Sequence, residues 1–352
     1  MKSKKIFIIF SGALLIGCAT TERGNNVIPA GGKNITFESA TKQLESTMTS
    51  MDKLDAIGVK INNANLSFNL NLPNYVEGND SSLPVPQMMV SENNYLDINI
   101  SDFDYEYKMS GLTSNSANEI KFINDLHVKF DMKTNMTSDS RLENMKYDMS
   151  YKSYLNNLNL YVDLSDPDFF KFLEMFSTMY VKEGKYCFPL SSSSLVLDEN
   201  MFATLYNSVK TQMTENPQML NSLKAFMNCK SYNNGNYALS IDITKEKIVD
   251  YCTTYIENSS TEGLTSSQIA EINSAYTVAI NAALKDFKYV RAGITFNDKS
   301  IKNISYDIDA TIYDGDLKAS LKSKMAIDFT YGNDVKIVMP DFNDYFSVEV
   351  FY

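Results

Sequence analysis

The chain has no tryptophan, a single histidine, and few glycines and prolines for its 352 residues. The lone histidine, His127, excludes a metal site built from several histidines. Fourteen glycines and eight prolines, beside 44% hydrophobic and 21% charged residues, are typical of a globular chain rather than a disordered one. Beyond the first five residues there is no basic cluster, and the net charge is −11, so we expect no nucleic-acid partner.

Long hydrophobic runs are also missing, since no run approaches the roughly 20 residues that a membrane-spanning helix needs. One shorter run, from Ile6 to Ile16, follows Lys2, Lys4 and Lys5. A basic start followed by a short apolar stretch is typical of a secretory signal. Residues 1–17 are therefore predicted to be a signal peptide.

The signal region ends in the motif Leu15-Ile16-Gly17-Cys18. This motif resembles the lipobox of bacterial lipoproteins. The resemblance implies cleavage before Cys18 and acylation of its sulfur, which would make Cys18 the lipidation site and the membrane its partner. Two or three acyl chains give a stable anchor, because each buried CH₂ contributes about 0.8 kcal/mol and one chain binds only reversibly.

The next segment, residues 18–36, is polar, aperiodic and rich in glycine, and we interpret it as a lipidated flexible tether. Ala19 and Thr20 occupy positions where enterobacterial lipoproteins of the inner membrane carry aspartate. The protein is therefore expected to be exported and lipid-anchored to the outer membrane, at its periplasmic face or at the cell surface.

The remaining chain, residues 37–352, is interpreted as one domain. Apolar spacing predicts a helix from Glu38 to Ile57 that Gly58 ends, and a strand over residues 65–72. A change of apolar phase at Asp102 predicts a bulge, and residues 335–339 are expected to form a last strand. Strands, then helices, then strands indicate an α+β fold. The expected form is a large curved antiparallel sheet, or half-barrel, with helices on its concave face.

Element order also carries a resemblance to a known fold group. An N-terminal helix leads into a strand, Leu158–Leu164 runs into a helix that starts at Asp166-Pro167, and a meander closes the chain with VKIVMPDFNDY. This order resembles the LolA/LolB and LppX group of lipoprotein-carrier and lipid-binding folds. The resemblance implies a non-enzymatic lipid carrier and transfers no functional residue.

Motifs of catalysis are missing or incomplete in the sequence. There is no G-x-S-x-G nucleophile motif, and Gly31-Gly32-Lys33 is without the upstream glycine of a phosphate-binding loop. The pairs Asp102/Asp104 and Asp307/Asp309 each share one strand face, but this is the face opposite the apolar residues. We therefore predict no catalytic residue, no metal and no cofactor, and no enzymatic activity.

Three cysteines remain once Cys18 is set aside: Cys187, Cys229 and Cys252. An oxidising compartment favours one disulfide, and three pairings are open. We prefer Cys187 with Cys229, and three free thiols are the alternative.

Aromatic and methionine side chains are abundant, with 22 Tyr, 20 Phe and 18 Met. They fill an ordinary core in one interpretation and line a pliable ligand site in the other. The leading hypothesis is a monomeric, anchored protein that binds or carries an apolar ligand such as a lipid or acyl chain. The alternative is a surface adhesin or structural lipoprotein with a filled core and a contact loop at residues 73–92. Candidate ligand-lining residues are Phe68, Leu70, Phe130, Met132, Met149, Leu160 and Val162.

Overall fold

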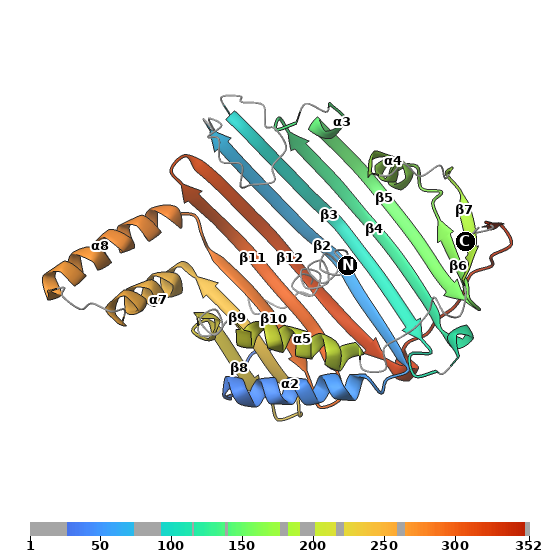
Figure 1. Cartoon of the computed structure of the whole chain (residues 1–352), viewed down its shortest axis with the longest axis horizontal. Helices are drawn as coiled ribbons and strands as arrows, with labels where there is room; N and C mark the ends of the chain where they lie inside the picture. Colours follow the sequence, from blue (N-terminus) through green and yellow to red (C-terminus); the bar gives the residue numbers. More distant parts are fainter. Residues whose placement is uncertain are drawn as a thin grey trace.

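A computed structural model of the chain describes residues 27–73, 93–114, 116–137, 140–176, 182–190, 201–215, 222–258 and 265–348. Its strands form one sheet in the order β1-β8-β9-β10-β11-β12-β2-β3-β4-β5-β6-β7-β13 (Figure 1). All neighbouring strands run antiparallel except β13, which pairs with β7 in parallel. Within the described ranges, no helix combines the length and the apolar character that crossing a bilayer requires.

The strands vary from two to eighteen residues in length, and the longest lie in the middle of the sheet. They are β1 (Lys33–Asn34), β2 (Ala56–Pro73), β3 (Asn93–Ser110), β4 (Lys121–Thr134), β5 (Asn144–Asn156), β6 (Asn159–Asp163), β7 (Lys185–Pro189), β8 (Met227–Ser231), β9 (Tyr237–Thr244), β10 (Tyr289–Phe296), β11 (Ile301–Asp314), β12 (Leu317–Tyr331) and β13 (Phe346–Ser347). The helices are α2 (Phe37–Met51), α3 (Ser140–Glu143), α4 (Pro167–Phe176), α5 (Met201–Glu215), α7 (Lys245–Asn258) and α8 (Ser266–Ala283).

The two central strands β2 and β3 are interrupted at the same level. Asn63 and Asp102 both adopt positive φ, at 49° and 50°, and the strand register shifts beside each of them. The Asn63 N–H donates to the Asp104 carboxylate at 2.8 Å, which ties the two irregularities together. The bulge predicted at Asp102 is thus confirmed, and paired bulges of this kind increase the twist and bend of a sheet.

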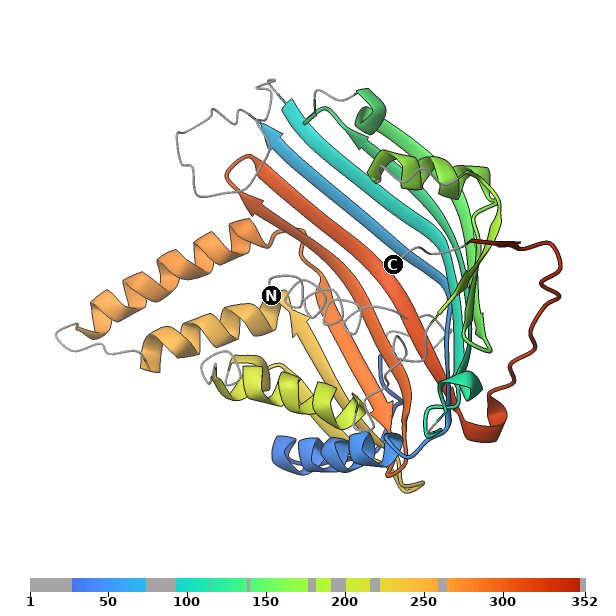
Figure 2. The ribbon, with the colours of Figure 1, turned by 45° about the vertical axis from the view of Figure 1, so that its right-hand side comes forward.

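The described helices lie on one side of the sheet, the side toward which the strands curve (Figure 2). Helix α2 packs Ala40, Met48 and Met51 against Leu239 of β9 and Phe296 of β10. At the other end, Phe172 of α4 meets strands β4 and β5 through edge-to-face ring contacts. The predicted fold class, an α+β half-barrel with helices on the concave face of a large antiparallel sheet, is confirmed.

Helices α7 and α8 form a hairpin that extends away from the sheet (Figure 1). The Thr265 side chain and Gln268 form a capping box at the start of α8, because each accepts a hydrogen bond from the other's backbone N–H. At the sheet end of the hairpin, Leu284 and Phe287 pack against Ala310 and neighbouring side chains. The hairpin is therefore attached to the sheet at its base.

Two predicted element boundaries are wrong. The first helix ends at Met51, and Ala56 and Ile57 already pair with β3, so Gly58 lies inside β2. A side chain at Gly58 would meet Thr330 of the neighbouring strand, which explains the glycine by close packing rather than by a helix stop. Residues 335–339 form no strand, and the segment continues to β13 at the far edge of the sheet.

The tether prediction is wrong for its second half. From Val27 onward the chain is packed on the sheet: Ile28 is 9% exposed, and Lys33–Asn34 pair with β8 as strand β1. Thr36 then caps helix α2, accepting a hydrogen bond from Ser39 N–H. Residues 18–26 lie outside the described residues.

Candidate functional site

Strand register places one large set of apolar side chains on the helix-bearing face. Residues that pair directly in a sheet point to the same side, and one such row runs Leu321, Phe68, Ile98 and Met132 through β12, β2, β3 and β4. Other rows lie parallel to it. Taken strand by strand, the residues of these rows are Ile304, Tyr306, Ile308, Ala310 and Ile312 on β11; Ala319, Leu321, Ser323, Met325, Ile327, Phe329 and Tyr331 on β12; Ile57, Val59, Ile61, Ala64, Leu66, Phe68, Leu70 and Leu72 on β2; Asn94, Leu96, Ile98, Ile100, Phe103, Tyr105, Tyr107 and Met109 on β3; Phe122, Asn124, Leu126, Val128, Phe130, Met132 and Thr134 on β4; Met145, Tyr147, Met149, Tyr151, Ser153 and Leu155 on β5; and Leu160 and Val162 on β6.

No residue in these rows is charged. We call this surface the apolar face. The opposite, convex face of the same strands carries ion pairs, among them Lys129–Asp102 at 2.8 Å and Lys152–Asp125 at 3.0 Å. The sheet therefore separates an uncharged surface from a charged one.

The seven candidate ligand-lining residues all lie on the apolar face. Strand β2 carries Phe68 and Leu70, β4 carries Phe130 and Met132, β5 carries Met149, and β6 carries Leu160 and Val162. Met149 is buried at 6% exposure, and the other six are half-buried. Sequence alternation thus assigned each of them to the correct face.

The middle of the apolar face is partly open. The main helix–sheet contacts of the described residues are α2 on β8 and β9, α3 on β4 and β5, α4 on β5, α7 on β9, and α8 on β11. Between these contacts, Phe68, Leu96 and Ile98 remain half-buried, and Ile312 is 48% exposed. The described helices therefore cover these apolar side chains only in part.

The polar groups on the apolar face are neutral. Tyr107 donates to the Met109 sulfur at 2.9 Å, and the Asn124 amide donates to Ser153 Oγ at 3.2 Å. Burial raises the pKa of Tyr107 to about 12, with a smaller contribution from the neighbouring Tyr105, so its hydroxyl stays protonated at physiological pH. These groups offer hydrogen bonds to an uncharged ligand atom but no counter-charge to an ionised one.

The proposed disulfide between Cys187 and Cys229 is wrong. Both thiols and that of Cys252 are free. Cys187 lies on β7 and Cys229 on β8, and nine strands separate β7 from β8 in the sheet order. Cys187 also pairs with Tyr161 of the convex face, whereas Cys229 packs under α2. A disulfide requires Cα atoms within about 7 Å, which this sheet excludes.

The acidic pairs considered for catalysis lie on the convex face, where Asp102, Asp104 and Asp309 each contact a different neighbouring residue. The Lys129 ammonium holds the pKa of Asp102 below its usual value, while Asp104 accepts from Asn63. Asp309 pairs with Lys288 at 2.6 Å. His127 lies on the same face and contacts Asp148 at 2.7 Å. The structure thus engages these side chains in local contacts.

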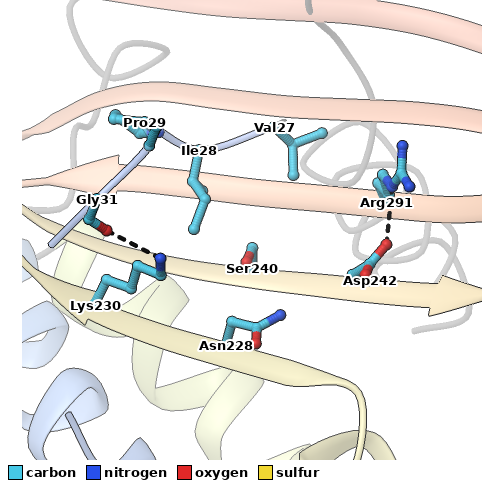
Figure 3. A pocket seen from close by; sticks show the side chains of 10 residues that line it. Val27, Ile28, Pro29, Gly31, Asn228, Lys230, Ser240, Asp242 and Arg291 are labelled. Carbon is cyan, nitrogen blue, oxygen red and sulfur yellow. Dashed lines mark hydrogen bonds and ion pairs between the residues drawn. The ribbon is translucent and has the colours of Figure 1, made fainter. Parts of the chain in front are cut away.

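A second feature, which the sequence did not predict, is a cavity of about 330 Å³ on the convex face. Residues 27–31 form one wall, and side chains of β8, β9 and β10 form the other (Figure 3). Asp242 lies in it and pairs with Arg291 at 2.8 Å. Sequence reasoning missed this cavity because residues 27–31 carry no periodic pattern that would indicate packing.

Comparison with known proteins yields no family for this chain. No family model matches it, and no curated protein matches it. Among solved structures, the crystal structure of LprF from Mycobacterium bovis matches with a TM-score of 0.25 and 6% sequence identity, over 88% of this chain and 99% of that one. A TM-score this low carries no argument about either fold or function.

Proposed function

We propose that this protein is an exported, non-enzymatic lipoprotein that is anchored through acylated Cys18 and binds an apolar ligand on the concave side of its sheet. The lipobox at Leu15-Ile16-Gly17-Cys18 supports the anchor. The observation that supports ligand binding is the uncharged, partly open apolar face. The adhesin alternative depends on the loop at residues 73–92, of which 74–92 lie outside the described residues.

The apolar face favours the hydrocarbon part of a lipid. Each CH₂ that it removes from water contributes about 0.8 kcal/mol. An ionised headgroup buried there would lose its hydration without gaining a counter-charge, a cost of several kcal/mol. The ligand is therefore an acyl chain or neutral lipid, and any charged headgroup stays at the rim in water.

The absence of tryptophan provides a direct test. A Phe68→Trp variant carries one tryptophan on the apolar face, and Asn69→Trp places the same reporter one residue along β2 on the convex face. Both variants are prepared in the chain from Ala19 onward. A fatty-acyl ester with a brominated chain should quench Phe68→Trp and leave Asn69→Trp unchanged.

Equal quenching of the two variants, or none in either, would contradict binding on the apolar face. Native mass spectrometry of the same chain gives a second readout. We expect bound lipid to be carried through purification, and a chain that stays empty after exposure to lipid vesicles argues against the proposal.

A further inference from the structure

Residues 27–36, which we call the strap, are held to the sheet by several independent contacts. The Ile35 N–H donates to the Cys229 carbonyl at 3.0 Å beside the β1–β8 pairing. Lys230 Nζ and the Tyr232 hydroxyl donate to carbonyls of the strap, those of Gly31 at 2.9 Å and Pro29 at 2.8 Å. Ser305 Oγ donates to the Val27 carbonyl at 2.6 Å. The strap is thus fixed along its whole length.

A glycine in the sheet makes room for the strap. At Gly293 of β10, an added Cβ would lie 2.7 Å from Ile28 Cγ2 and 2.9 Å from the Val27 carbonyl oxygen. Real Cβ atoms do not approach other atoms this closely, so a side chain here would lift the strap. Gly293 is buried and faces the convex side of the sheet. Its neighbours Ala292 and Ile294 pair with Tyr306 and Ile304 of the apolar face, and successive residues of a strand face opposite sides.

The strap gives the start of the described chain a definite position. From β1 at the sheet edge it passes back over β8, β9 and β10 to β11, where the Val27 carbonyl accepts a hydrogen bond from Ser305. Figure 3 shows the part of this path from Gly31 to Val27. Val27 therefore lies inward on the convex face, on the side opposite the helices and the apolar face. From this point the chain leads toward Cys18.

The distance available between Val27 and Cys18 is short. Nine Cα–Cα steps join them, which reach at most about 31 Å when fully extended, and a flexible chain of this length spans only about 17 Å on average. To bring the apolar face to the anchor, the chain would first cross about 19 Å of sheet, from β11 back to the edge at β1. It would then pass the sheet and its helix layer, about 20 Å more.

We propose that the anchored protein lies with the convex face of β8–β11 against the bilayer that holds its own acyl chains, so that its apolar face opens away from that bilayer. The inference rests on acylation of Cys18, which belongs to the proposed function. The strap decides the orientation because it starts the short link on the convex side. The apolar face is then positioned to exchange lipid with a partner in the aqueous space rather than with its own membrane.

Two neighbouring residues of β12 serve as reporters of this orientation. Lys324 is exposed on the convex face, and Met325 is half-buried on the apolar face. Each is replaced by tryptophan in the full-length acylated protein, reconstituted in phosphatidylethanolamine–phosphatidylglycerol vesicles that contain dansyl-labelled headgroups. Phe68→Trp replaces the second reporter if Met325→Trp fails to fold.

Energy transfer to the dansyl groups should be roughly twofold greater from Lys324→Trp than from the apolar-face reporter, since structural layers are about 10 Å thick. Inserting about twenty Gly/Ser residues between Gly24 and Asn25 should abolish the difference, because the longer link reaches either face. Equal transfer from the two reporters in the chain of natural length, or greater transfer from the apolar face, overturns the proposed orientation.

Flotation of the vesicles and the mass of the Cys18 peptide are measured on the same samples. Protein that floats with an acylated Cys18 and shows equal transfer refutes the orientation alone. Protein that neither floats nor carries acyl chains refutes the anchor, and the orientation with it.

Discussion

Asp242 shows how single charged residues are accommodated on the convex face. Its carboxylate accepts from Arg291 Nε at 2.8 Å and from Lys247 Nζ at 2.7 Å. Partial burial by itself raises the pKa of Asp242, but the two cationic partners outweigh burial and hold the pKa below its ordinary value. The ionised form is therefore favoured in the folded protein, which couples folding to pH.

We predict that Asp242→Asn destabilises the protein by about 0.5–1 kcal/mol at pH 7, the range for partly exposed ion pairs. A carboxyl with a lowered folded-state pKa stabilises above its unfolded pKa of about 3.9, and this contribution disappears as pH falls through the folded value. Urea unfolding at pH 7 and pH 3 should show the difference shrinking toward the lower pH. Asp314→Asn, at the exposed β11–β12 turn, is the control.

At the level of elements, the strap depends on partners that are distant in sequence. Val27 bonds to Ser305, Ile28 packs over Gly293, and Pro29 bonds to Tyr232. Each contact by itself is of ordinary strength, about 1 kcal/mol for a hydrogen bond. Together they convert a glycine-rich stretch, which resembles a linker, into part of the fold.

Gly293→Val should release the strap, because its side chain would occupy the space of Ile28. We expect a loss of about 1–3 kcal/mol in the free energy of unfolding, typical of overpacking. Cleavage by trypsin after Lys33, measured by mass spectrometry on the folded protein, should become much faster. Ser305→Ala, which removes one hydrogen bond to the strap, should have a smaller effect. Unchanged protection of Lys33 in Gly293→Val would show that the strap is not held at this point.

At the level of the whole molecule, the sheet keeps the cysteines apart. Cys187 and Cys229 lie on different faces near opposite edges, and burial raises the pKa of both thiols. A protonated thiol is a poor nucleophile, so oxidation is disfavoured by both distance and chemistry.

The chain should therefore unfold at the same denaturant concentration with and without a reducing agent. Loss of a native disulfide would lower the free energy of unfolding by about 2–5 kcal/mol. Unfolding with and without the reducing agent therefore distinguishes a protein with free thiols from one with a disulfide. Thiol labelling of the unfolded, unreduced chain from Ala19 onward should modify Cys187, Cys229 and Cys252 alike. A reductant-dependent midpoint would contradict the free thiols.

Sequence alone predicted what depends on neighbouring residues. Period-two alternation assigned Phe68, Phe130 and Val162 to the correct face, because a strand places alternate side chains on opposite sides. The change of phase at Asp102 predicted its bulge for the same reason. The lipobox at Cys18 is likewise read from adjacent residues, and its acylation stays a prediction.

Only the tertiary structure decided which distant segments meet. Strand order placed β1 beside β8 and moved Cys187 far from Cys229, and no local pattern encodes that order. The strap has no periodicity, since its contacts come from Gly293, Ser305 and Tyr232 in other strands. Local patterns thus determined the two faces of the sheet, whereas long-range pairing determined where the anchored end of the chain leaves it.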